Sequence, residues 1–322
     1  MAEVGGPTLV HLPRIGKDAG DAAGPSAAPD PPMEGSATMS SAGPDDLVVT
    51  RATLDDWPVI SGWAADEGWN PGLSDGAAFF AQDPEGFFIG RLDGEPVSAV
   101  SVVTYGTDYA FLGCYLVRPD LRGRGLGLTT WKTGLAHAGD RTVGLDGVVA
   151  QQDNYRRSGF EPAHRTVRFT GTVPAGEPVS GVRPAEKADF DAIAAYDSAC
   201  CPADRPGFLK HWLTTPGHRV FVRPGDGRLT GYAVIRPARD GLRIGPLFAD
   251  GAEDADALFA ALAAEAAGRE IAVDVPEPNT AAVTLAERAG LTPSFETARM
   301  YTGPVRSFAE ERVYGVTTLE LG

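Results

Sequence analysis

A glycine-rich turn in the first half of the chain carries the residues best suited to chemistry. It reads Arg122-Gly123-Arg124-Gly125-Leu126-Gly127 and stands between a segment with strand character and one with helical character. Its small residues leave the backbone N–H groups accessible. The helix that follows adds unpaired N–H groups and a partial positive charge at its first turn. We therefore expect the turn to bind an anion such as a pyrophosphate.

The overall charge excludes one class of partner. The chain has 322 residues and a formal net charge of -15, and it is 43% hydrophobic and 22% charged. These fractions are ordinary for a globular protein. Nucleic-acid binding needs a basic face, so we expect a small molecule, neutral or cationic, as the partner and no nucleic acid. No run of about eighteen apolar residues is present, so we expect no membrane partner.

Cysteine and histidine spacing predicts neither a metal site nor a disulfide framework. The three cysteines are Cys114, Cys200 and Cys201, and they lack the spacing of zinc ligands. His211 and His218 lie on either side of a Pro-Gly turn, with no third ligand at a suitable spacing. We therefore expect no metal and a cytoplasmic location, where thiols stay reduced.

The elements that must position the turn follow from hydrophobic periodicity and turn residues. Residues 109–117 predict the strand before the turn, and residues 126–137 predict the helix after it. The rest of this half predicts strands at 47–52, 86–92, 96–105, 142–150 and 160–169 and helices at 55–66, 74–82 and 153–158. Asp93-Gly94 is a typical hairpin turn between the second and third strands.

The second half repeats this order of elements. The predicted strands lie at 181–185, 218–222, 229–235, 242–248 and 271–275, and the helices at 190–200, 208–213, 255–267 and 279–289. The clearest repeat is residues 167–171 against 298–303. We predict two copies of one fold, as domains 46–172 and 181–322 joined by a linker at 173–180. Residues 1–45, rich in Gly, Ala, Pro and Ser, predict a disordered tail.

The glycine turn and its surroundings resemble a known family. Residues 122–127 resemble the R/Q-x-x-G-x-G/A signature of the GNAT N-acetyltransferases, and Val117-Arg118-Pro119 stands where that family has V-x-P. The tandem order is similar to the YitH-like GNAT proteins, whose C-terminal half is a second, degenerate GNAT domain. Residues 67–72, 145–147, 154–160 and 299–301 carry that likeness. The resemblance implies a mixed α+β class with two tandem GNAT (acyl-CoA N-acyltransferase) folds, each a mostly antiparallel twisted sheet flanked by helices.

The resemblance implies an enzyme that uses acetyl-CoA as cosubstrate. In this family the fourth and fifth strands splay apart, and the pantetheine arm lies in the gap. Backbone groups of the fourth strand then polarise the thioester carbonyl. The residues expected to bind the cosubstrate are Leu116, Val117, Arg122, Gly123, Arg124, Gly125, Leu126, Gly127, Thr129 and Asn154.

Tyr155 is the catalytic residue that the resemblance implies. It stands four residues before Gly159-Phe160, where the family has its general-acid tyrosine in a Y-x-x-x-G-F run. A phenol within reach of the sulfur can protonate the departing thiolate. The alternative role is a tyrosine that packs the short helix onto the sheet.

The general base is not defined by the sequence. Many GNAT enzymes place a glutamate on the fourth strand, but residues 109–117 contain no carboxylate. A water chain could serve instead, or Asp146 could face the substrate; a structural hydrogen bond to a loop is the alternative for Asp146. Trp69 and Asn70 either form a wall of the acceptor pocket or anchor their loop.

The second copy departs from the family where cosubstrate binding needs it most. Residues 249–256 carry four carboxylates in place of the glycine-arginine turn, and these would repel a pyrophosphate. Ala286 stands in the position of the tyrosine. We therefore expect this half to bind no CoA and to shape an acceptor pocket between the domains.

These features favour an N-acetyltransferase in which a primary amine attacks acetyl-CoA directly in a ternary complex. The acidic composition favours a cationic small amine as acceptor. Two alternatives fit the same glycine turn: a non-enzymatic acyl-CoA sensor, and a protein-lysine acetyltransferase. The sequence leaves the oligomeric state open.

Overall fold

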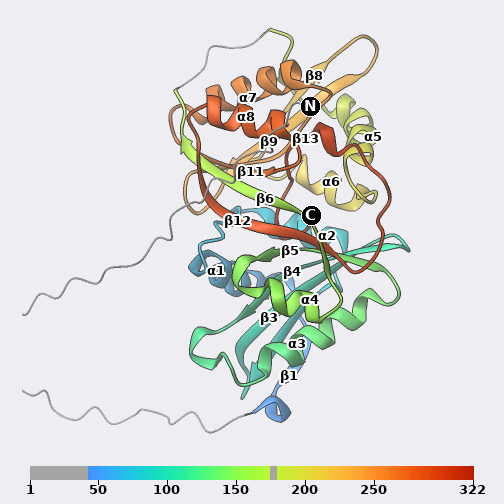
Figure 1. Cartoon of the computed structure of the whole chain (residues 1–322), viewed down its shortest axis with the longest axis vertical. Helices are drawn as coiled ribbons and strands as arrows, with labels where there is room; N and C mark the ends of the chain where they lie inside the picture. The colour runs from blue at the N-terminus through green and yellow to red at the C-terminus, as the bar shows by residue number, and fades with distance from the viewer. Residues whose placement is uncertain (1–42, 175–179) are drawn as a thin grey trace, which may run out of the picture. The chain divides into compact units, whose positions relative to one another are not determined.

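The computed structural model describes residues 43–174 and 180–322, and their strands form one continuous sheet (Figure 1). The strand order is β1-β2-β3-β4-β5-β12-β6-β11-β10-β9-β8-β7, with β13 paired to β10. Residues 1–42 of the tail expected at 1–45 lie outside the described residues. Gly43 precedes a short 3-10 helix, Pro44–Asp46. Residues 175–179 of the expected linker also lie outside them.

The first half follows the predicted order of elements. Its strands are β1 (Val48–Arg51), β2 (Phe87–Leu92), β3 (Glu95–Tyr105), β4 (Tyr109–Val117), β5 (Thr142–Val148) and β6 (Glu161–Thr172). Its helices are α1 (Trp57–Asp66), α2 (Asp75–Gln82), α3 (Leu126–Leu135) and α4 (Gln152–Arg157). Asp93 and Gly94 both have positive φ, at 50° and 85°, as the predicted hairpin turn requires.

The second half repeats that order and adds one strand. Its strands are β7 (Arg183–Pro184), β8 (Arg219–Pro224), β9 (Leu229–Pro237), β10 (Leu242–Ala249), β11 (Glu270–Pro276), β12 (Thr292–Tyr301) and β13 (Val313–Gly315). Its helices are α5 (Phe190–Cys200), α6 (Pro206–Trp212), α7 (Ala252–Ala266) and α8 (Thr280–Arg288). The predicted tandem of two mixed α/β copies is confirmed, and β13 is a strand that the sequence did not indicate.

The sixth strand of each copy, β6 or β12, pairs with the other copy. Strand β6 of the first half lies antiparallel to β11, from Thr172↔Glu270 to Thr166↔Pro276. Strand β12 of the second half lies antiparallel to β5, from Val148↔Thr297 to Gly144↔Tyr301. Figure 1 shows β6, in yellow-green, and β12, in red-orange, side by side at the centre of the sheet. The boundary between the copies along the sequence is therefore not a boundary in the sheet.

Buried ion pairs and aromatic stacking fasten the two copies to each other. Arg236 on β9 donates to both oxygens of Asp75 on α2, at 2.9 and 3.2 Å. Phe79 on α2 stacks on Trp212 on α6, with ring centroids 6.3 Å apart. One hydrophobic core contains side chains of both α2 and α6, so the two copies share a core. None of the described helices combines the length and apolarity needed to cross a bilayer.

Candidate active site

The parallel strands β4 and β5 open into a gap beside the glycine turn. They pair from Tyr109↔Thr142 to Leu112↔Leu145. In the described structure no pairing continues beyond Leu112, and β4 carries a bulge there, with Cys114 at a φ of 45°. The strands therefore separate at the end that faces the turn, as the resemblance implied.

The turn has the geometry of an anion site. Gly123 and Gly125 adopt positive φ, at 78° and 82°, and α3 begins at the next residue. Among the described residues, no acceptor faces the backbone N–H groups of residues 123–128. A Cβ on Gly127 would lie 2.6 Å from the Tyr115 hydroxyl and 2.8 Å from Val117 Cγ2, so only glycine fits this close approach. Free amides at a helix N-terminus suit phosphate oxygens.

A cleft of about 430 Å³ runs from this turn to Tyr155. Of the residues expected to hold the cosubstrate, those that line it are Leu116, Val117, Arg122, Gly123, Gly125, Leu126 and Gly127. Asn154 lines an adjoining cavity of about 340 Å³, while Arg124 and Thr129 line neither. The predicted cosubstrate residues are thus largely gathered around one groove.

Arg122 closes one side of the cleft. Its Nε donates to the carbonyl of Val117 at 3.1 Å, and its terminal nitrogen pairs with the carboxylate of Glu67. Glu67 lies on the loop after α1 and also lines the cleft. Because Glu67 offsets this guanidinium, the positive potential of the cleft depends mainly on the free amides and the start of α3.

Tyr155 packs against the sheet and also lines the cleft. Its ring is buried, stacks on Trp131 with centroids 5.6 Å apart and packs against Gly147, where a Cβ would come within 2.7 Å of the ring. Its hydroxyl has no hydrogen-bond partner within the described residues, although the residue lines the cleft and an inner cavity. Burial raises the pKa of Tyr155 well above the ordinary tyrosine value, so the phenol stays protonated and can donate.

The inner cavity, of about 40 Å³, lies between the separated ends of β4 and β5. Tyr155, Cys114, Asp146, Trp69 and Glu320 are among its lining residues. Burial raises the pKa of the Cys114 thiol far above its usual range, so at neutral pH it is not the thiolate that an acyl-enzyme would need. Glu320 belongs to no motif and was not anticipated, since its only sequence context is the end of the second copy.

Asp146 is engaged by a side chain that the sequence did not indicate. Arg299 on β12 donates to both of its oxygens, at 2.9 and 2.8 Å, and both side chains are buried. Burial raises the pKa of Asp146, and the guanidinium limits that rise. This partner lies on β12, which the second copy places beside β5 and which we call the exchanged strand, and not on a loop. Asp146 also lines the inner cavity, so its predicted contact with the substrate stays a prediction.

Asn70 and Trp69 have different contacts in their loop. The Asn70 amide donates to the carbonyl of Asp240, and its oxygen accepts from the Asp240 N–H, both at 2.8 Å. Its side chain therefore anchors the loop to the second copy. Trp69 lines both the cleft and the inner cavity, and its carbonyl accepts from Arg168 at 2.6 Å.

The equivalent gap of the second copy is filled. Strands β10 and β11 pair from Leu242↔Ile271 to Ile244↔Val273, and β13 then pairs with β10 at Leu247↔Gly315. The N–H of Val316 donates to the carbonyl of Asp274 on β11 at 2.9 Å, so the segment lies between the two strands. The four acidic residues after β10 are each paired with arginine: Asp250 with Arg228, Glu253 and Asp254 with Arg223, and Asp256 with Arg288.

A further cavity lies in this second copy and reaches β6 and β12 through His164 and Arg299. It measures about 610 Å³. Its polar lining includes His164, Arg299, Asp250, Glu310 and Glu311. Within the described ranges, no three His, Cys, Asp or Glu side chains gather as metal ligands would.

Known proteins match both halves of the chain. The Acetyltransferase (GNAT) family matches residues 51–160, and the Acetyltransferase (GNAT) domain matches residues 193–315. A holothin acyltransferase of Pseudoalteromonas sp. (strain SANK 73390) is 35% identical over 277 residues, which cover 84% of this chain and 93% of the relative.

Solved structures share the fold at low sequence identity. A Pyrococcus horikoshii protein assigned as an acetyltransferase superposes with a TM-score of 0.74 at 22% identity, over 86% of this chain and 96% of that one. A tandem GNAT protein from the clavulanic acid biosynthesis pathway superposes with a TM-score of 0.56 at 16% identity, over 80% and 99%. These likenesses support the tandem architecture.

Proposed function

The chain belongs to the GNAT acetyltransferase family, and from that premise we propose that it transfers an acetyl group from acetyl-CoA to the primary amine of a small molecule. The observation that carries the proposal is the continuous cleft from the glycine turn to Tyr155. It joins an anion site to a protonated phenol by way of a gap between two strands, and a CoA thioester needs all three features. As a member of this family the protein is an acyltransferase.

The first copy supplies the groups that bind and polarise the thioester. The free amides of residues 123–128 would hold the pyrophosphate, and the unpaired edge of β4 near Leu116 would pair with the pantetheine amides. One fixed donor at the thioester oxygen is worth about 10²–10³ in rate. Tyr155 would then give its proton to the departing sulfur. The protonated, buried state of Cys114 supports direct attack by the amine over an acyl-enzyme.

The second copy supports a small acceptor. Its cavity of about 610 Å³ has Glu310 and Glu311 on its lining, both exposed, and it reaches Arg299 next to the inner cavity. Exposed carboxylates attract a cationic amine. The relative is named a holothin acyltransferase, not a protein acyltransferase. We propose the same class of acceptor here, ahead of protein lysine.

The experiment is to incubate the purified chain with acetyl-CoA and a panel of amines that includes holothin, polyamines and a lysine peptide. Release of free CoA thiol and the mass of the acylated product are measured. We expect turnover with at least one small amine and less with the peptide. Tight acetyl-CoA binding without thiol release across the panel would instead support a sensor.

A further inference from the structure

A buried glutamate from the second copy lies in the inner cavity of the first. Glu320 is 4% exposed and lines the same cavity as Tyr155 and Cys114. Its Oε2 is buried and has no hydrogen-bond partner among the described residues. An unpaired carboxylate oxygen in such a place costs several kcal/mol unless something binds to it. The oxygen is therefore available to a group that enters the cavity.

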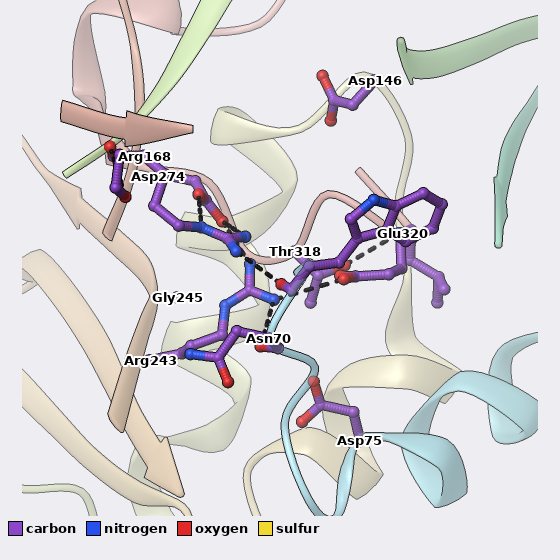
Figure 2. Close-up of polar contacts among 12 residues, drawn as sticks. Asn70, Asp75, Asp146, Arg168, Arg243, Gly245, Asp274, Thr318 and Glu320 are labelled. Carbon is purple, nitrogen blue, oxygen red and sulfur yellow. Dashed lines mark hydrogen bonds and ion pairs between the residues drawn. The ribbon is translucent and has the colours of Figure 1, made fainter. Parts of the chain in front are cut away.

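The other oxygen of Glu320 is held by a chain of buried charges. Arg243 on β10 donates to Oε1 at 3.4 Å and also pairs with Asp274. Arg168 on β6 donates to both oxygens of Asp274, at 2.7 and 3.0 Å. Figure 2 shows this chain running from Arg168 and Asp274 through Arg243 toward Glu320. In this cluster two guanidinium groups therefore face two carboxyl groups.

The backbone around Glu320 is fixed against β4. The hydroxyl of Tyr105 donates to the carbonyl of Leu321 at 2.8 Å, and the N–H of Leu321 donates to the Thr318 hydroxyl at 2.9 Å. A Cβ on Gly113 would lie 2.1 Å from the carbonyl oxygen of Glu320. Glycine at this position of β4 therefore lets the segment approach the strand where the gap opens.

We propose that Glu320 is the general base of the reaction and takes the proton from the acceptor amine. The proposal rests on the acyl transfer proposed above. Strand β4 has no carboxylate of its own, and both oxygens of Asp146 are already bound by Arg299. Among the described residues, Glu320 has a carboxylate oxygen without a hydrogen-bond partner in the cavity that also holds the phenol.

The proton and electron balance of this step is complete. The amine nitrogen forms a bond to the acyl carbon while Glu320 Oε2 takes the proton that the nitrogen loses. The carbon–sulfur bond breaks, and the sulfur keeps the electron pair and receives the proton of Tyr155. Proton return from Glu320 to the phenolate through water restores both residues. The net change is one amide formed and one free thiol released.

The test compares Glu320→Gln with the unchanged protein, using an amine that the latter acylates. Glutamine keeps the shape and a weak bond to Arg243 but cannot accept a proton. We expect kcat/KM to fall about 100-fold near neutral pH, the usual size of general-base catalysis. The loss should shrink as the pH rises, because hydroxide can then take the proton that the carboxylate accepts from the attacking nitrogen. The affinity for acetyl-CoA should stay within about twofold, since the glycine turn is untouched.

Two further variants separate catalysis from folding. Glu320→Ala should regain activity when formate is added, because a small carboxylate can enter the vacated space. Glu287→Gln on the exposed face of α8 should behave as the unchanged protein. The proposal would be overturned if Glu320→Gln lost the same fraction of kcat/KM at every pH, had a lower melting temperature, and if formate did not rescue Glu320→Ala. Glu320 would then be a structural partner of Arg243. Failure of the unchanged protein on every amine would overturn the acyl-transfer function itself, which is a distinct result.

Discussion

The two copies contain the same pair of parallel strands, but only one pair is open. Strands β4 and β5 separate beyond Leu112, and a cleft of about 430 Å³ leads from the gap to the glycine turn. Strands β10 and β11 separate beyond Ile244, but β13 fills the space between them. The two copies therefore differ by local changes within one topology: the acidic residues 249–256, Ala286 in the position of the tyrosine and the inserted strand β13. We infer that these changes leave the second copy without a cosubstrate site.

The closed copy remains necessary to the open one. It supplies β12, whose Arg299 binds Asp146 on β5, and it supplies the segment that carries Glu320 into the inner cavity. In return β6 completes the second copy through Arg168 and Asp274. We infer that the degenerate copy has kept a positioning role after losing its own site.

The largest effect is expected from Arg299→Met, which breaks the link between the exchanged strand and the open gap. It leaves Asp146 buried without a partner, which typically costs about 3–5 kcal/mol of unfolding free energy. Urea unfolding measures this cost. The matched control is Arg156→Met, which removes an exposed pair with Asp153 and should cost less than about 1 kcal/mol. Equal costs would mean that the exchanged strand is not held by this pair.

Tyr155→Phe tests the tyrosine that the second copy lacks. Loss of a general acid should lower kcat about 100- to 1,000-fold and leave the KM for acetyl-CoA nearly unchanged. Because burial raises the pKa of Tyr155, the kcat of the unchanged protein should show no tyrosine ionisation up to about pH 10. Tyr115→Phe removes the other phenol of the cavity and should change kcat less than about threefold. Wild-type turnover by Tyr155→Phe would refute the assignment.

Gly123→Asp gives the open copy the acidic character of the closed one. Space around Gly123 is free, and aspartate tolerates its positive φ, so the fold should be kept. The added carboxylate should weaken acetyl-CoA binding about 30-fold by repelling the pyrophosphate. Gly123→Asn has the same shape without the charge and should lose about threefold at most. Calorimetric titration measures both, and equal losses would place the pyrophosphate elsewhere.

The sequence predicted the parts of this site that depend on neighbours along the chain. The hairpin at Asp93-Gly94, the strand before the turn and the helix after it all follow from local turn chemistry and periodicity. The glycine turn was predictable for a similar reason. Positive φ at Gly123 and Gly125 and the close approach of side chains to Gly127 both favour glycine at those positions. Tyr155 was placed by its spacing to Gly159, and the structure brings it to the end of the cleft.

The parts that the sequence did not predict depend on contacts between distant segments. The sequence repeat shows that two copies exist. It does not show that β12 of the second copy, and not β6 of the first, pairs with β5. The partner of Asp146 follows from that exchange and is 153 residues away. Strand β13 is three residues long, too short for periodicity to reveal. Glu320 has no motif around it, and only Gly113 on β4 reflects its approach.

Amide hydrogen exchange with and without acetyl-CoA would report directly whether only the first copy binds the cosubstrate. We expect slower exchange at residues 116–128 and 146–155, which border the open gap, with the largest change at residues 123–128. We expect no change at 245–256 or 313–316. Gly123→Asp should remove the protection at the turn. Protection at 245–256 with none at 122–128 would contradict the claim that only the first copy binds the cosubstrate.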